Sequence, residues 1–184
     1  MAIEIELKFF LENPEKTIQA LNEKAEPIKE DYQKDIYYLP VHRNFIEKKP
    51  VSEWLRIREA KNKSSINYKR WHNDKANAIS CDEFETSIEN IEHLKNILNR
   101  LDFKELIIVE KIRKNWKYKN TIISIDKITG LGHFIEIEIE KHEFEKIEKA
   151  KKYLYEILGE LNLKLGKQDF EGYPYLLLKK KGLI

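Results

Sequence analysis

The sequence is poor in the residues that build cysteine and glycine motifs. It has one cysteine, Cys81, which excludes an internal disulfide and a cysteine-based zinc cluster. A free thiol also fits a reducing compartment. Its six glycines form no P-loop, and Gly130-x-Gly132 is no dinucleotide-binding fingerprint, because no third glycine and no suitable helix follow. Any chemistry on phosphate must therefore use side chains instead of a glycine-rich cradle.

The sequence also lacks a long apolar run and an excess of one charge. No stretch approaches the ~20 apolar residues of a membrane helix, and the N-terminal MAIEIELK lacks the basic and apolar regions of a signal peptide. The 34 Lys and Arg nearly balance the 32 Asp and Glu, and the net charge is +2. This balance gives no overall attraction to nucleic acid or membrane. We therefore expect a cytoplasmic protein that binds neither, and, without a low-complexity linker, a single domain over residues 1–184.

Periodic patterns predict three helices and about eight strands. Apolar residues have helical spacing in segments 13–25, 91–101 and 144–161. The first begins at Asn13-Pro14, an expected N-cap followed by proline at the first helical position. Alternation of period two occurs in segments 3–10, 35–39, 53–59, 65–71, 82–86, 109–118, 121–126 and 133–140. These elements predict an α+β protein dominated by an antiparallel sheet.

The predicted strands carry charged residues on one face. In EIELK, residues 4–8, Glu4, Glu6 and Lys8 alternate with Ile5 and Leu7. Carboxylates and an ammonium group therefore share one face of the strand. The same alternation recurs at Arg56, Arg58, Lys69, Glu83, Glu85, Lys111, Arg113, Asp126, Glu136, Glu138 and Glu140. The residues between these positions are mostly apolar.

Two arrangements account for this pattern. In the first, an open sheet turns its charged face to solvent. In the second, the amphipathic helices cover the apolar face from outside, and so many strands curl and close into a barrel. The charged faces then line a water-filled tunnel. We expect the second arrangement, an eight-stranded antiparallel closed β-barrel with a charged interior and flanking helices outside.

A tunnel lined in this way needs ligands of both signs. Two like charges at alternate positions of a strand lie about 7 Å apart and repel by roughly 2 kcal/mol at an effective dielectric constant of about 20. A hard cation such as Mg²⁺ would neutralise the carboxylates and bridge them to substrate phosphates. A polyanion would neutralise the basic residues, because the fork of arginine matches phosphate oxygens in pairs. The residues alone thus indicate a metal-assisted polyphosphate site, although interleaved salt bridges on a wet sheet would give the same pattern.

The order of the motifs resembles the CYTH superfamily, also called the triphosphate tunnel metalloenzymes. Glu4-Ile5-Glu6-Leu7-Lys8 resembles its ExExK signature. Later segments resemble the family in the same order, and these are Asp35-Ile36-Tyr37, Leu55-Arg56-Ile57-Arg58, Tyr68-Lys69, Glu83-Phe84-Glu85, Lys111-Ile112-Arg113, Ile125-Asp126 and 130–138. The resemblance covers essentially the whole chain. The EIELK, LRIR and LGxFxEIE forms are most similar to the class IV adenylate cyclases.

The resemblance implies roles for the charged positions. It implies a triphosphate bound by six basic residues, which are Lys8, Arg56, Arg58, Lys69, Lys111 and Arg113. It implies Mg²⁺ or Mn²⁺ held by Glu4, Glu6, Asp126, Glu136 and Glu138, with Glu83 and Glu85 on the opposite wall. The residues expected to act in catalysis are Glu4, Glu6, Lys8, Glu136 and Glu138. Asp126 precedes a glycine-containing turn, so capping of that turn competes with metal binding.

Three functions remain open at this point. The resemblance implies a class IV adenylate cyclase-like enzyme that converts ATP to cyclic AMP and pyrophosphate. The same tunnel could instead hydrolyse tripolyphosphate, thiamine triphosphate or a nucleoside triphosphate, or bind polyphosphate or nucleotides without catalysis. The resemblance also suggests a homodimer. Three departures from the family pattern bear on the identity of the substrate. Cys81-Asp82 stands where related sequences have a basic residue just before the Glu83-x-Glu85 pair. Arg70-Trp71 stands in place of small turn residues, and Gly172-Tyr173 stands in place of a Ser-Tyr pair.

Overall fold

The chain folds into a large antiparallel sheet with four helices. The computed structural model describes residues 3–61, 63–71, 80–140, 144 and 146–184, and it describes their side chains except at 3, 4 and 80. The strands are β1 (Ile3–Phe10), β2 (Glu26–Pro27), β3 (Asp31–Pro40), β4 (Glu53–Ala60), β5 (Ser64–Trp71), β6 (Ser80–Ile88), β7 (Phe103–Tyr118), β8 (Thr121–Ile128) and β9 (Gly132–Ile139). The helices are α1 (Pro14–Lys24), α2 (Ile91–Arg100), α3 (Ile147–Leu161) and α4 (Tyr173–Lys180). In the described ranges no helix is long and apolar enough to cross a membrane.

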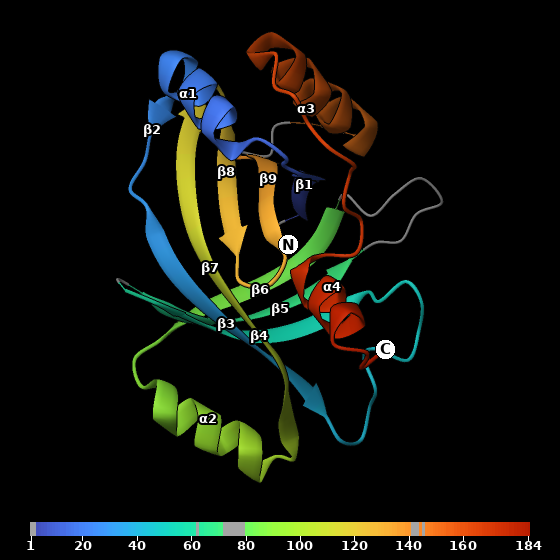
Figure 1. Cartoon of the computed structure of the whole chain (residues 1–184). Coiled ribbons are helices and arrows are strands. Elements are labelled where there is room, and N and C mark those ends of the chain that lie inside the picture. The colour runs from blue at the N-terminus through green and yellow to red at the C-terminus, as the bar shows by residue number, and fades with distance from the viewer. Residues whose placement is uncertain (1–2, 62, 72–79, 141–143, 145) are drawn as a thin grey trace.

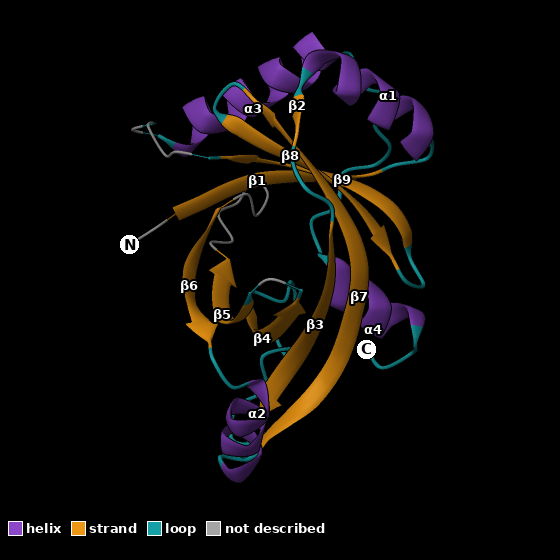
Figure 2. Cartoon of the chain, turned by 90° about the vertical axis from the view of Figure 1, so that its left-hand side faces the viewer, coloured by secondary structure: helices purple, strands orange, loops and turns teal. Residues whose placement is uncertain are grey.

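The sheet is strongly curled and has the strand order β2-β7-β3-β4-β5-β6-β1-β9-β8. Because β2 contributes only two residues, eight longer strands form the half-barrel that Figures 1 and 2 show. β7 is 16 residues long, and it pairs with β3 over residues 103–113 and with β8 over residues 111–118. The predicted α+β class, antiparallel pairing and curvature are confirmed. Closure of the half-barrel into a tunnel stays a prediction.

Local signals in the sequence set the ends of several elements. Asn13 caps α1, because its Oδ1 accepts a hydrogen bond from the backbone N–H of Lys16 at 3.3 Å. The turn between β8 and β9 contains Gly130 and Gly132, whose φ angles are +82° and +102°. Residues with a Cβ rarely adopt such angles, so the two glycines allow β9 to return antiparallel to β8. The predicted N-cap and this predicted turn are both confirmed.

Three helices cover the convex, apolar face of the sheet. Figure 2 shows α1 and α3 lying across β1, β8 and β9. Leu21 of α1 and Leu154 of α3 are fully buried in one apolar cluster with Ile5, Leu7, Ile123 and Ile137 of the strands. α2 packs through Leu98 against Ile36 of β3 and Ile57 of β4. The opposite, charged face of the strands is therefore the concave one.

The fourth helix packs on the concave side, and the periodic patterns do not predict it. Tyr173, Leu177 and Leu178 of α4 are buried in one apolar cluster with Val109 of β7 and Phe134 of β9. These two strand residues lie two positions before Lys111 and Glu136, so they share the face of the charged residues. The apolar cluster fills one part of the concave face, and the charged residues begin beside it.

Candidate functional site

A cavity of about 260 Å³ lies on the concave face. All six basic residues to which the family resemblance gives a phosphate-binding role line it, and these are Lys8, Arg56, Arg58, Lys69, Lys111 and Arg113. Five of the predicted acidic residues line it as well, and these are Glu6, Glu83, Glu85, Glu136 and Glu138. Side chains from β1, β4, β5, β6, β7 and β9 thus converge on one space.

Asp35 on β3 holds the two arginines of β4. Arg58 donates from Nε and Nη2 to the two carboxylate oxygens of Asp35, both at 2.7 Å, and Arg56 donates from Nη1 at 3.3 Å. Burial acts to raise the pKa of this carboxyl group, but the charges of Arg56 and Arg58 outweigh burial and hold the pKa well below its usual range. The Nε of Arg56 is buried and has no hydrogen-bond partner among the described residues. Asp35 thus fixes both arginines at positions where they line the cavity.

Lys111 and Arg113 of β7 lie beside Asp126 of β8. Arg113 donates from Nε to Oδ1 of Asp126 at 2.7 Å and from Nη2 to Oδ2 at 2.6 Å. The Nζ of Lys111 is 3.6 Å from Oδ2 of Asp126 and 3.9 Å from Oδ2 of Asp35. Burial, followed by the charge of Arg113, lowers the pKa of Lys111 to about 7. An anion brought beside Lys111 would favour its protonated form.

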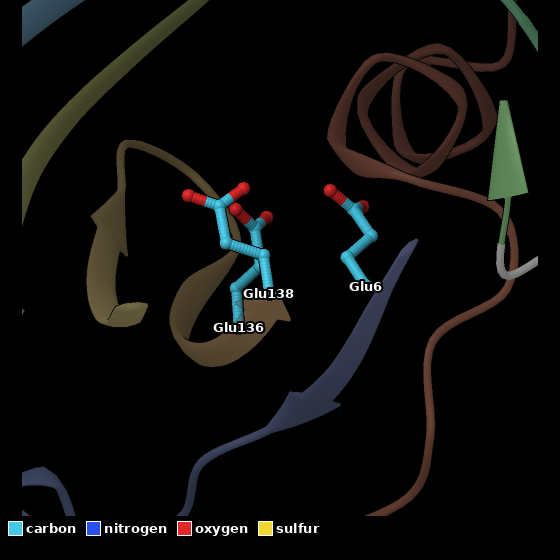
Figure 3. Close-up of side chains that lie close together, drawn as sticks. All are labelled: Glu6, Glu136 and Glu138. Atoms are coloured by element: carbon cyan, nitrogen blue, oxygen red, sulfur yellow. The ribbon is translucent and has the colours of Figure 1, made fainter. Parts of the chain in front are cut away.

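Three carboxylates converge between β1 and β9. Glu6, Glu136 and Glu138 each offer one oxygen, and these oxygens lie within 4.8 Å of one another (Figure 3). The pairing of β1 with β9 creates this cluster, because it sets Glu6 opposite Glu138 and Lys8 opposite Glu136. The Nζ of Lys8 lies 3.2 Å from Glu6 and 3.1 Å from Glu136.

The chemistry of this cluster fits a divalent cation. Burial acts to raise the pKa of Glu136, but the charges of Arg113 and Lys8 outweigh it and hold the pKa well below its usual range. The carboxylate is therefore ionised, and it also accepts a hydrogen bond from Nη2 of Arg113 at 3.0 Å. Converging ionised oxygens are the ligands that Mg²⁺ and Mn²⁺ prefer. The three glutamates could hold such an ion in the same cavity that the arginines and lysines line.

β5 and β6 form the opposite wall. Glu83 of β6 accepts a hydrogen bond from the side-chain amide of Asn67, and its Oε1 lies 3.5 Å from Nζ of Lys69. The register of the two strands sets Asn67 opposite Glu85 and Lys69 opposite Glu83. This wall therefore combines one basic side chain, Lys69, with the carboxylates of Glu83 and Glu85, whereas the wall of β4 and β7 is mainly basic.

Two predicted residues, Glu4 and Asp126, are not among the described side chains that line the cavity. The side chain of Glu4 lies outside those described, so its predicted role stays a prediction. Asp126 is fully buried behind Arg113 and does not line the cavity. Asp126 lies within β8, and its carboxylate accepts hydrogen bonds from Arg113 instead of capping the turn that follows the strand.

The structure also adds residues that the sequence does not assign. Tyr37, Asn67 and the segment 168–174 line the cavity, and Asp35 organises the arginines. Alternation along β3 carries a signal for Asp35 and Tyr37, because both fall on its concave face. Nothing in the pattern of 168–174 places that segment at the cavity. Of the departures from the family pattern, Trp71 and Gly172 line the cavity, whereas the side chain of Arg70 is 63% exposed and Cys81 is fully buried.

Comparison with known proteins agrees with this geometry. The sequence matches the CYTH domain family over residues 2–173. The Methanocaldococcus jannaschii protein named "Putative adenylate cyclase MJ0240" is 33% identical over 162 residues, which cover 88% of this chain and 90% of that protein. The solved structure of the PH1819 protein from Pyrococcus horikoshii OT3 has a TM-score of 0.85 at 32% identity, with 96% of this chain and 99% of that chain covered.

A solved plant structure shares the fold at lower identity. HpAC1 from Hippeastrum, described as an adenylyl cyclase candidate with a dominant triphosphatase activity, has a TM-score of 0.65 at 18% identity. The similarity covers 99% of this chain and 96% of that chain. At this identity the similarity shows a common fold alone.

Proposed function

This chain belongs to the CYTH domain family, and we propose that it is a class IV adenylate cyclase-like enzyme that uses Mg²⁺ or Mn²⁺. In the proposed reaction, ATP is converted to cyclic AMP and pyrophosphate. One observation carries the proposal, namely that three carboxylates of β1 and β9 converge in the same cavity as the basic residues of β4 and β7. The name of the M. jannaschii relative supports the cyclase reaction. We also propose that the half-barrel closes around the substrate, because β7 pairs with both β3 and β8.

The basic residues bind and orient the triphosphate in this proposal. Arg56, Arg58 and Arg113 present guanidinium groups that are already held by aspartates, so little ordering remains when phosphate binds. Lys111 gains a full charge as the phosphates arrive, and Lys8 and Lys69 add point charges from β1 and β5. Together the six residues neutralise the phosphate chain and fix the α-phosphorus near the three glutamates.

Glu6, Glu136 and Glu138 hold the divalent cation in this proposal. When bound, the cation stabilises negative charge at the α-phosphate and lowers the pKa of the ribose 3′-hydroxyl. The 3′-oxygen forms a bond to the α-phosphorus while the bond to the bridging oxygen of the β-phosphate breaks, and the hydroxyl proton passes to solvent. Lys8, beside Glu6 and Glu136, stabilises charge on the pyrophosphate that leaves. Glu4 remains a further predicted ligand.

A triphosphatase is the second candidate. Water would attack the γ-phosphorus of a triphosphate held by the same residues, the bond from this phosphorus to the oxygen that bridges to the β-phosphorus would break, and the diphosphate part would leave as orthophosphate forms. The activity described for HpAC1 favours this candidate, since that protein shares the fold. Both candidates use the same basic wall and the same three glutamates, and they differ in which oxygen attacks and in which phosphorus it attacks.

Phosphorus NMR of the products separates these reactions. Protein incubated with ATP and Mn²⁺ should release pyrophosphate together with cyclic AMP. Orthophosphate would instead establish hydrolysis, and tight binding without either product would establish a binding module.

Glu136→Gln tests the site itself, and it should abolish metal-dependent turnover because it removes an ionised ligand. Glu140→Gln is the matched control, because Glu140 pairs with Lys117 at 2.7 Å and neither residue lines the cavity. It should retain the wild-type rate. A wild-type rate in Glu136→Gln would remove this cluster from the active site.

A further inference from the structure

Asp126 lies behind the cavity wall, and Tyr173, which lines the cavity, donates a hydrogen bond to it from the phenolic hydroxyl. We infer that both are positioning residues for the triphosphate site: Asp126 aims Arg113 at phosphate instead of serving as a metal ligand, and Tyr173 of α4 fixes Asp126. This inference rests on the proposed function. It changes the role that family resemblance gives to Asp126, and it gives a role to a helix that the sequence patterns do not predict.

Both oxygens of Asp126 are already engaged. Oδ1 accepts from Nε of Arg113 at 2.7 Å, and Oδ2 accepts from Nη2 of Arg113 at 2.6 Å and from the hydroxyl of Tyr173 at 2.8 Å. The residue is fully buried. Among the described acidic residues, the group whose oxygens converge within 4.8 Å consists of Glu6, Glu136 and Glu138 and excludes Asp126. Three charge-assisted or neutral hydrogen bonds thus orient the carboxylate of Asp126 toward Arg113 and Tyr173, away from the three glutamates.

Asp35 provides an independent example of the same arrangement. It receives Arg58 through Nε and Nη2, at 2.7 Å each, and it is 1% exposed. Asp126 receives Arg113 through the same two nitrogens. In each pair the aspartate is buried and the arginine lines the cavity. A bidentate contact of this kind fixes the plane of the guanidinium group and leaves Nη1 for a ligand.

Tyr173 connects this arrangement to α4. The tyrosine is 5% exposed, and the Nζ atoms of Lys8 and Lys111 lie 4.6 Å and 5.4 Å from the centre of its ring. Its hydroxyl donates to Asp126, which holds Arg113, and Arg113 in turn donates to Glu136 at 3.0 Å. One tyrosine from the C-terminal helix therefore contacts Lys8 and Lys111 directly and reaches Arg113 through Asp126.

Separate titrations of the two ligands test the inference. Calorimetry with MnCl₂ alone and with tripolyphosphate alone is performed on wild type, Asp126→Asn, Tyr173→Phe, the double variant and Glu136→Gln. Asp126→Asn should weaken tripolyphosphate binding at least about tenfold, because an amide cannot accept both arginine N–H groups. Its Mn²⁺ affinity should stay within about threefold of wild type, whereas Glu136→Gln should lose at least about tenfold in Mn²⁺ affinity.

Tyr173→Phe separates positioning from direct contact with the ligand. It should weaken tripolyphosphate binding by about threefold to tenfold, and it should add little to the loss in the Asp126→Asn background, because the hydroxyl acts through that carboxylate. Tyr32→Phe is the matched control, since Tyr32 donates to Glu110 at 3.0 Å on the exposed side of β3. It should bind both ligands as wild type does. If thermal unfolding shows that Asp126→Asn is not folded, the inference is tested by Tyr173→Phe alone, which should lose tripolyphosphate affinity and keep the Mn²⁺ affinity of wild type.

Each contrary result has a definite meaning. A loss of Mn²⁺ affinity in Asp126→Asn equal to that in Glu136→Gln would make Asp126 a ligand and overturn the inference. Wild-type tripolyphosphate binding by Tyr173→Phe would overturn the role of Tyr173, and so would additive losses in the double variant. If wild type itself bound no tripolyphosphate, the proposed function would fail, and the inference would fail with it.

Discussion

The pKa of Lys111 makes anion binding in the cavity depend on pH. Burial and the charge of Arg113 lower this pKa to about 7, so the ammonium form predominates below neutral pH and the neutral amine above it. A phosphate beside Nζ favours the ammonium form and raises the pKa again. Binding above neutral pH therefore takes up a proton, and the affinity for tripolyphosphate must fall as pH rises through about 7.

The size of this effect follows from a single titrating group. The apparent affinity is reduced by a factor of about 1.1 at about pH 6 and about 11 at about pH 8, when the intrinsic pKa is about 7 and only the protonated form binds. The loss between these conditions is therefore roughly tenfold. At about pH 8 the complex takes up about 0.9 proton for each ligand bound, by the same relation.

Calorimetry at about pH 6 and about pH 8 measures the change in affinity, and its repetition in two buffers with different ionisation enthalpies measures the number of protons taken up. Lys111→Met removes the titrating group, and Lys114→Met is the matched control because Lys114 is exposed on the same strand and pairs with Glu30 at 3.1 Å. Tripolyphosphate titrates identically with all three proteins, so its own contribution cancels in the comparison. Wild type and Lys114→Met should share the steep pH dependence, and Lys111→Met should lack it. Equal proton uptake by wild type and Lys111→Met would refute the reasoning.

Two further substitutions test the arginine contact and the core. Arg58→Lys should weaken tripolyphosphate binding by about tenfold to hundredfold in calorimetry, since lysine cannot reproduce the bidentate contact with Asp35. Arg43→Lys is the control, because Arg43 is exposed and pairs with Glu53. A loss in Arg58→Lys no larger than in the control would contradict this reasoning. Leu154→Ala should lower the free energy of urea unfolding by about 2–5 kcal/mol, because Leu154 of α3 is fully buried in the apolar cluster between this helix and the sheet. Less than about 1 kcal/mol, the effect expected at an exposed site such as Leu183, would be inconsistent with that packing.

The sequence predicts the strands and the charged face because alternation is a local property. The segment predicted at 3–10 forms β1 with these same bounds, and the alternation of Glu6 with Leu7 separates the cavity from the convex core. The helix predicted at 91–101 forms α2 at Ile91–Arg100 for the same reason, since Leu94 and Leu98 both face the sheet. Such patterns need no knowledge of which strands are neighbours.

The contacts between strands could not be predicted in this way. Asp126 shares the inward alternation of Arg113, but the register of β7 with β8 decides that it lies behind the arginine. α4 escapes detection because Leu176, Leu177 and Leu178 are consecutive and give no helical period. Tyr173 therefore lacks any local sign of its contact with Asp126, a residue 47 positions earlier in the chain.

The effect of Mn²⁺ on tripolyphosphate affinity tests most directly whether one cavity holds a cation and a phosphate chain together. Glu6, Glu136 and Glu138 share the cavity with the six basic residues, so an ion held by the glutamates should also contact bound phosphate. Wild type should bind tripolyphosphate at least about tenfold more tightly with saturating Mn²⁺ than without it, and Glu136→Gln should lose most of this gain. Equal dissociation constants for wild type with and without Mn²⁺ would contradict the account.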